Sequence, residues 1–178
     1  SHGRIPVDPY YVGRCAGPMT RTVEDAAFSM ATLSRTDWRD GTSLPPENID
    51  WLDPDIDVKG LKIGLMLDAG VGLAVEPEVR DAVIAAAKRF EEAGAIIVPV
   101  EPVMTRAMLD GLDALWRARF WGDIEALSPE RREKILPYIL HWAEGGADVS
   151  GVDAVRGFNQ TIAMRQACGK LFSTVDAV

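Results

Sequence analysis

Serines are the side chains that could carry covalent chemistry in this sequence. A serine becomes a nucleophile when a base lies within ~2.6–3.2 Å and donors are placed for the oxyanion. Such a serine often stands in a tight glycine-rich turn. The serines here occupy positions typical of helix caps and solvated loops instead, namely Ser1, Ser29, Ser34, Ser43, Ser128, Ser150 and Ser173. The sequence therefore predicts no serine nucleophile in this chain.

Histidines and cysteines suggest no alternative centre. His2 lies near the start of the chain, and His141 lies next to a tryptophan in a segment with helical character. Either could serve as a general base, but ordinary packing or surface roles explain both. Cys15 and Cys168 have no partner at a metal-like or redox spacing. We therefore expect reduced thiols, no metal and no cofactor.

One loop resembles a phosphate-binding turn. Asp68-Ala69-Gly70-Val71-Gly72 follows an expected strand, and glycines in that position can let backbone N–H groups approach a phosphate. A third glycine and a later acidic residue for a ribose have no convincing counterpart. We therefore expect no nucleotide site.

Hydropathy predicts an α/β protein. Residues 61–67 form an apolar run typical of a strand that is buried on both faces, and residues 95–100 form a second, β-branched run. Between them, Pro77 with flanking acids begins a helix, and Gly94 is placed to end it. This strand–helix–strand order predicts a parallel pair.

The first third of the chain contains one helix and one long loop. Thr22 is a predicted N-cap, and an apolar stripe follows it as far as Leu33, which should face a core. Residues 34–60 are rich in Asp, Pro, Gly and Ser and have no period, so we expect a surface loop.

The second half is predicted to be helical. Pro137 should kink or split one of its helices. Ser128 and Ser150 are candidate caps. The expected helices lie near 103–126, 129–144 and 151–175.

Composition limits the class of protein and its partners. The formal net charge of −8 would repel nucleic acid, so we expect no nucleic-acid partner. No apolar stretch approaches the ~20 residues of a membrane span, and we expect a cytoplasmic protein. The chain begins at Ser1 rather than Met and stops soon after an apolar helix, so both ends look cut. One domain across residues 1–178 is expected, although two folding units remain open.

An eleven-residue segment carries a family resemblance. The run from Gly17 to Ala27, GPMTRTVEDAA, is similar to a stretch of amidase-signature hydrolases in which Gly-Pro, Arg, Ser or Thr, Val and Asp recur. Gly3-Arg4-Ile5-Pro6 and Gly60-Leu61-Lys62-Ile63-Gly64 resemble the segments before and after it. The resemblance covers residues 1–100, and residues 101–178 share mainly their helical character and Arg165.

This resemblance implies part of a three-layer α/β/α fold, with residues 1–33 as motif loop and helix, 34–60 as loop, 61–100 as strand–helix–strand and 101–178 as a helical region. Family members use a Ser nucleophile, a second Ser in a cis peptide and a Lys, set partly in a Gly/Ser-rich segment. That segment is missing from this sequence, so the resemblance implies no catalytic residue here. It implies structural roles for Gly17, Pro18, Arg21, Thr22 and Asp25, including a charge pair between Arg21 and Asp25.

The same resemblance suggests a substrate-binding surface. Trp116, Phe120 and Trp121 fall on the same or adjacent faces of the helix near 103–126, where related amidases line an acyl pocket. Packing in a core would explain the same spacing.

The implied function is that of a fragment of an amidase acting on a small carboxamide, inactive alone. Alternatives are a non-catalytic α/β binding or regulatory module, or part of an amidotransferase A-type subunit. If the rest of a parent core is missing, apolar surface should be exposed and the chain should self-associate.

Overall fold

The computed structural model describes residues 3–7, 14–53 and 57–178. The chain divides into two compact units, Ser1–Asp57 and Val58–Val178. The expectation of one domain across all 178 residues stays a prediction.

Helix α1 (Val23–Leu33) lies in the first unit and is the one helix among its described residues. It begins at the predicted N-cap, Thr22, and none of its residues is fully buried. Ala26, Ala27 and Met30 are half-buried, but Val23 at the start of the stripe is 68% exposed. The stripe is therefore only half-covered by the described residues of this unit, and the prediction that it packs into a core is not met there.

Asp40 organises the segment after α1. Its side chain is buried, with the residue 5% exposed, and its carboxylate accepts bonds from the Val7 backbone N–H at 3.2 Å and the Thr42 hydroxyl at 2.6 Å. The Thr42 backbone N–H also donates to it, at 2.8 Å. A buried carboxylate requires such partners. The predicted surface loop 34–60 is therefore not wholly at the surface.

The second unit contains the predicted parallel pair. Strand β1 (Lys62–Leu65) pairs with β2 (Ile96–Pro99), with Ile63 opposite Ile97. Helix α2 (Pro77–Glu92) connects them. Gly94 ends the turn after the helix with a φ of 99°, a conformation that glycine adopts without a Cβ clash. Both strands are confirmed, slightly shorter than predicted.

The last residues of the chain pair with the other edge of β1. Ala177 forms a parallel bridge with Ile63, and its carbonyl accepts from the Gly64 N–H at 2.7 Å. The Asp176 carboxylate accepts from the Lys62 N–H at 2.8 Å. A helix was predicted as far as residue 175, and that boundary is wrong, because the pairing with β1 draws the chain into an extended form.

Apolar surface of the second unit stays uncovered. Strand β1 was predicted to be buried on both faces, yet only Gly64 is buried and Lys62 is exposed. On α2, Val79 is 54% exposed and Phe90 is 43% exposed. The predicted strand burial is therefore wrong in this chain, and the exposed side chains agree with the expectation of an uncovered apolar surface.

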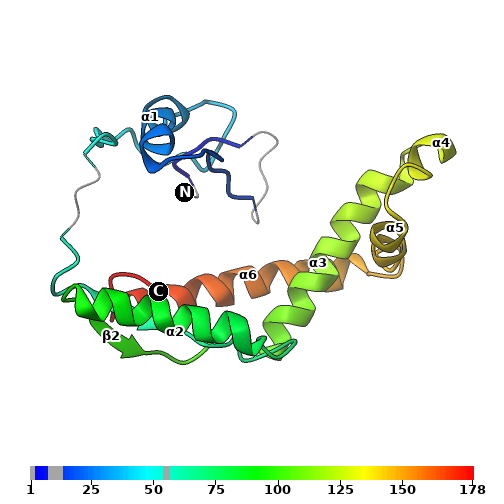
Figure 1. Cartoon of the computed structure of the whole chain (residues 1–178). Coiled ribbons are helices and arrows are strands. Elements are labelled where there is room, and N and C mark those ends of the chain that lie inside the picture. Colours follow the sequence, from blue (N-terminus) through cyan, green and yellow to red (C-terminus); the bar gives the residue numbers. More distant parts are fainter. Residues whose placement is uncertain (1–2, 8–13, 54–56) are drawn as a thin grey trace. The chain divides into compact units, whose positions relative to one another are not determined.

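Two long helices cross at a pair of glycines. Figure 1 shows α3 (Arg106–Glu125) crossing α6 (Gly151–Phe172). Gly157 is buried, and a Cβ there would overlap the Gly111 carbonyl oxygen. Glycine at both positions lets the two backbones approach, and this crossing is the largest helix contact in the unit.

Helices α4 (Pro129–Arg132) and α5 (Pro137–Glu144) replace the single helix predicted over 129–144. The proline split is confirmed, because Pro137 occupies the first turn of α5, where its missing N–H costs nothing. Ser150 caps α6 through the Asp153 N–H at 3.1 Å. Ser128 stands at the N-cap of α4 without a capping bond from its side chain.

The α/β class is confirmed by the parallel strands and the helices around them. None of the helices in the described part of the chain combines the length and apolarity that crossing a bilayer requires.

The glycine crossing generates a paired prediction. Gly157→Ala should lower stability by about 1–3 kcal/mol, because the added methyl group must push α3 and α6 apart. Gly169→Ala, on the same helix with nothing within 4 Å of its Cβ, should raise stability by about 0.5–1 kcal/mol. Urea unfolding followed by circular dichroism measures both. A rise in the midpoint for both variants would contradict the close crossing.

Candidate functional site

The motif segment leads into the start of α1. The Thr22 hydroxyl accepts a bond from the Asp25 backbone N–H at 3.1 Å. Thr20 supports the turn, because its hydroxyl donates to the Thr22 carbonyl at 2.8 Å. Gly17 and Pro18 lie before this turn, with Gly17 exposed and Pro18 half-buried. Thr22 therefore caps the helix, and the structural roles expected of Gly17 and Pro18 stay predictions.

The expected charge pair in this motif is not formed among the described residues. Arg21 is exposed and precedes the N-cap, whereas Asp25 lies inside the helix. Pairing at a spacing of four requires both residues on one helical face, and Arg21 is outside the helix. The prediction of an Arg21–Asp25 pair is therefore wrong within this unit.

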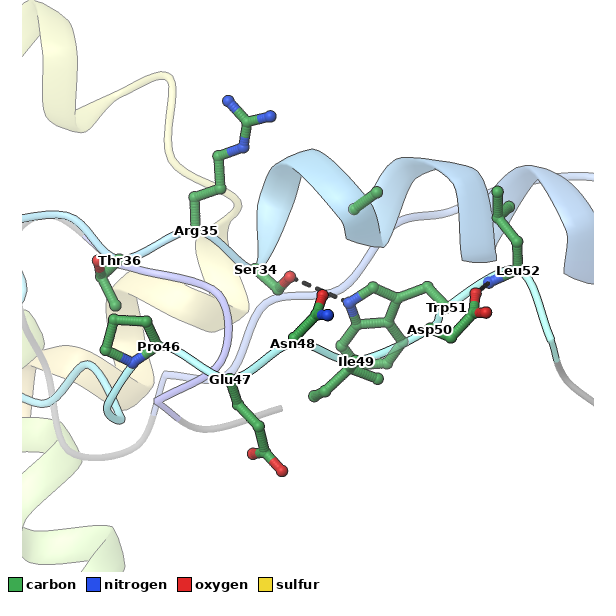
Figure 2. Close-up of a pocket in the computed structure, with 11 residues that line it drawn as sticks. Ser34, Arg35, Thr36, Pro46, Glu47, Asn48, Ile49, Asp50, Trp51 and Leu52 are labelled. Carbon is green, nitrogen blue, oxygen red and sulfur yellow. Dashed lines mark hydrogen bonds between the residues drawn. The ribbon is translucent and has the colours of Figure 1, made fainter.

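A hollow of about 390 Å³ lies beside the end of α1. Figure 2 shows the Trp51 indole turned toward Ser34, and its N–H donates to the Ser34 hydroxyl at 3.2 Å. Arg35 and Glu47 point in opposite directions from the backbone around the hollow (Figure 2). The charged groups do not converge, so this hollow shows no arrangement for acid–base chemistry.

A second hollow, of about 360 Å³, follows the carboxyl end of β1. It is formed by residues 67–75 with Arg80. Gly70 and Gly72 have φ of 77° and 94°, and the Asp68 carboxylate accepts from the Gly70 N–H at 2.6 Å. This carboxylate occupies a donor that a phosphate would need and adds a repelling charge. The geometry gives no support to a nucleotide loop.

The aromatic candidates separate into two groups. Trp116 and Phe120 are stacked on α3 with ring centroids 6.0 Å apart, and Phe120 meets the edge of Trp142 of α5 at 5.5 Å. Trp121 lies apart from this stack, with the Arg132 guanidinium 5.9 Å from its ring. All three predicted rings are half-buried and line neither hollow. Their assignment to substrate binding stays a prediction.

A polar network beside the rings was missed by sequence reasoning. Asp113 accepts from the Arg117 Nε at 2.6 Å and from the Trp142 indole N–H at 3.0 Å. Arg117 also donates to the Trp142 carbonyl oxygen at 2.9 Å. Asp113 and Arg117 stand four residues apart on one helix, a spacing that indicates their pair. The third member lies on another helix, so local spacing carried no signal for it.

Several serine hydroxyls are engaged in local bonds. Their partners lie three or four residues away in the pairs Ser29–Asp25, Ser150–Asp153 and Ser173–Lys170. The Ser150 bond is the main reason why the pKa of Asp153 is lowered, and Arg156 lowers it further. Ser43 differs, because its hydroxyl is buried and has no partner among the described residues. The Ser29 and Ser173 hydroxyls donate to backbone carbonyls, and the Ser150 hydroxyl donates to the Asp153 carboxylate, whose lowered pKa makes it a weaker base. None of these contacts is the arrangement of nucleophile, strong base and oxyanion donors that amide hydrolysis requires.

The described part of the chain shows neither a histidine placed as a general base nor a cluster of metal ligands. The His141 side chain is 92% exposed on α5, and its Nδ1 lies 3.8 Å from the Glu144 carboxylate. His2 lies outside the described residues. Within residues 3–7, 14–53 and 57–178, no group of three or more His, Cys, Asp or Glu is placed to hold a metal ion.

Comparison with known proteins shows the family. The amidase family model matches residues 1–178, and the chain therefore belongs to the amidase family. The match includes residues 101–178, where the sequence itself suggested little beyond helices and Arg165.

Two kinds of curated relative align with the chain. An acylamidase of Rhodococcus erythropolis is 31% identical over 148 residues, which are 79% of this chain and 31% of the relative. The A-type subunit of the glutamyl-tRNA(Gln) amidotransferase of Thermosynechococcus vestitus is 41% identical over 129 residues, covering 61% of this chain and 26% of the relative. Its counterpart from Brevibacillus brevis is 41% identical over 80 residues, which are 44% of this chain and 16% of the relative.

A solved bacterial aryl acylamidase of the amidase signature family has the same fold as this chain. It matches with a TM-score of 0.80 and 27% identity, over 98% of this chain and 39% of its own length. The chain thus spans less than half the length of each relative described here.

The capping bond of the family motif generates a prediction. Thr22→Ala should lower stability by about 0.5–2 kcal/mol, because the Asp25 N–H loses its acceptor. Thr22→Ser should restore most of the loss. Ser29→Ala is the matched control and should not lower stability, since this hydroxyl bonds back to the Asp25 carbonyl within the helix and alanine is the better helix former. Circular dichroism during urea unfolding measures all three, and equal midpoints for Thr22→Ala and the unaltered chain would contradict the cap.

Proposed function

We propose that this chain is part of a cytoplasmic amidase that hydrolyses a small carboxamide to a carboxylate and ammonia or an amine. One observation carries this proposal: the chain follows a solved aryl acylamidase over 98% of its own length with a TM-score of 0.80. A curated acylamidase also aligns with 79% of the chain. Two cysteines without a disulfide fit the reducing cytoplasm.

The proposed reaction proceeds through an acyl-enzyme. A serine hydroxyl attacks the amide carbon, its proton passes to the amide nitrogen, and the C–N bond breaks as the amine leaves. Water then attacks the acyl carbon, the bond from this carbon to the serine oxygen breaks, a proton from the water passes to the serine oxygen, and the acid leaves as a carboxylate. The nucleophilic Ser, the second Ser in a cis peptide and the Lys are proposed to lie in parts of the protein beyond this chain. Ser29, Ser150 and Ser173 support this placement, since their hydroxyls bond to groups three or four residues away.

Within that enzyme, the chain is proposed to supply sheet, scaffold helix and pocket wall. Strand β1 bonds on both edges and is suited to a central place in a larger sheet. Trp116, Phe120 and Trp121 are proposed to line the acyl site, because half-buried rings offer the apolar surface that an acyl group requires.

The second candidate is an amidotransferase A-type subunit. Its support is the higher identity, 41% over 129 residues, to such a sequence from Thermosynechococcus vestitus. The acylamidase alignment is longer, at 148 residues, and covers 79% of this chain, whereas the amidotransferase alignment covers 61%. A non-catalytic module is the weaker alternative, because the family match covers the whole chain. Glutamine hydrolysis without anilide hydrolysis would favour the amidotransferase.

The placement of the nucleophile generates a prediction. The purified 178-residue chain should release no aniline from acetanilide and no ammonia from acetamide, because no serine among residues 3–7, 14–53 and 57–178 has the base and oxyanion donors that activation requires. The full-length protein should hydrolyse a carboxamide or an anilide, with the product measured by chromatography.

Ser43→Ala in the full-length protein is the control, because Ser43 is the described serine with a buried hydroxyl and no described partner. Its rate should equal that of the unaltered enzyme. Turnover by the 178-residue chain, or loss of turnover in Ser43→Ala, would contradict the placement. A full-length protein without amide hydrolysis would contradict the proposed function itself.

A further inference from the structure

Trp142 is held on α3 at both its side chain and its backbone. The indole N–H donates to one Asp113 oxygen at 3.0 Å, while the Arg117 Nε donates to the other at 2.6 Å. Arg117 then donates to the Trp142 carbonyl oxygen at 2.9 Å, and its guanidinium lies 5.4 Å from the centre of the indole ring. Two residues one helical turn apart therefore define both the place and the orientation of one indole ring.

The glycines that follow α5 make this approach feasible. A Cβ on Gly146 would overlap the Arg117 carbonyl, and a Cβ on Gly145 would lie 2.8 Å from the Arg117 guanidinium. A larger residue at Gly146 would push the end of α5 away from α3, and one at Gly145 would displace the Arg117 guanidinium that bonds to Trp142. The close contact thus depends on sequence features of both helices.

The held indole determines the position of the ring stack. Phe120 meets Trp142 edge-on at 5.5 Å and lies over Trp116 at 6.0 Å, so the three rings form one continuous aromatic surface. Aromatic rings in such contact restrict each other's orientation. The arrangement of Phe120 therefore depends on a polar network that lies outside the ring stack.

Packing alone would not require this network. Asp113 and Arg117 keep 44% and 32% of their side-chain exposure, and a partly exposed ion pair contributes little to stability. Buried or half-buried polar contacts can instead specify one arrangement among several apolar packings. An oriented ring surface is useful where a ligand must be distinguished by its shape.

From these contacts we infer that Trp142 is a specificity-determining residue and that Asp113 and Arg117 are positioning residues which hold it. The inference rests on the proposed function, in which these rings line the acyl site. The Trp142 indole limits the length of the acyl group that fits against Phe120 and Trp116.

The test uses the full-length enzyme and the p-nitroanilides of acetate, butyrate and hexanoate. Release of nitroaniline gives kcat/KM for each substrate, and the hexanoyl-to-acetyl ratio is the readout. Because the amount of folded enzyme cancels in this ratio, a loss of stability does not change it. Trp142→Ala should raise the ratio about tenfold, since removing the indole lengthens the site.

The remaining variants test whether Asp113 acts on the ratio by holding the Trp142 indole in place. Asp113→Ala should shift the ratio in the same direction as Trp142→Ala. Asp113→Asn keeps an acceptor for the indole N–H and should restore the original ratio. Asp110→Ala is the matched control, because Asp110 forms the same type of pair with Arg106, at 2.7 Å, on the same helix and bonds to no residue of α5 in the described part of the chain.

An active enzyme whose ratio is unchanged in both Trp142→Ala and Asp113→Ala would overturn this inference alone. A shift in Asp110→Ala as large as that in Asp113→Ala would also overturn it, since helix stability would then explain both. An unaltered enzyme that hydrolyses none of the three anilides would overturn the proposed function and this inference with it.

Discussion

Backbone pairing on both edges of β1 is the constraint on which the second unit depends. One edge binds β2, about one helix further along the chain, and the other binds Asp176 and Ala177 after the whole helical region. After β2 the chain must therefore leave the sheet, form the helices between residues 101 and 172, and return to the edge of β1. Backbone donors and acceptors in a sheet are costly to leave unpaired. Several hydrogen bonds to the backbone of β1, rather than one side chain, therefore stabilise the return of the chain to the sheet.

The crossing of α3 and α6 makes that return compact. Gly111 and Gly157 let the two helices touch along their backbones, and α6 then leads directly to the residues that pair with β1. Helices α4 and α5 are carried on the far end of α3, as Figure 1 shows. Helix α5 is joined to α3 by the Asp113–Arg117–Trp142 network instead of by a glycine contact alone. The scaffold and the aromatic surface are thus held by different kinds of interaction.

Membership of the amidase family changes how the exposed apolar side chains are understood. Val79 and Phe90 of α2 are 54% and 43% exposed, which is unusual for apolar side chains on one stripe of an amphipathic helix. The solved aryl acylamidase is longer, since the matched region is 39% of its chain. In a larger α/β enzyme, additional sheet and helix layers provide the apolar partners that such faces require. The same reasoning applies to the half-covered face of α1.

Local signals in the sequence determined where the elements begin and end. Thr22 and Ser150 cap their helices, Pro77 and Pro137 begin theirs, and Gly94 supplies a positive φ, because each acts on backbone groups within a few residues. The family was also recognisable, since its motif is one continuous segment.

Only the tertiary structure decided which distant residues meet. The bond between Asp113 and Trp142 spans 29 positions, and Lys62 and Asp176 are separated by 114. Such pairs depend on the directions of whole helices, which no local pattern encodes. For the same reason Asp40 was expected at the surface but is buried, because its partner Val7 lies 33 residues away. The sequence alone therefore determined the elements and the family, while the assembly of the helices decided the contacts around the aromatic rings.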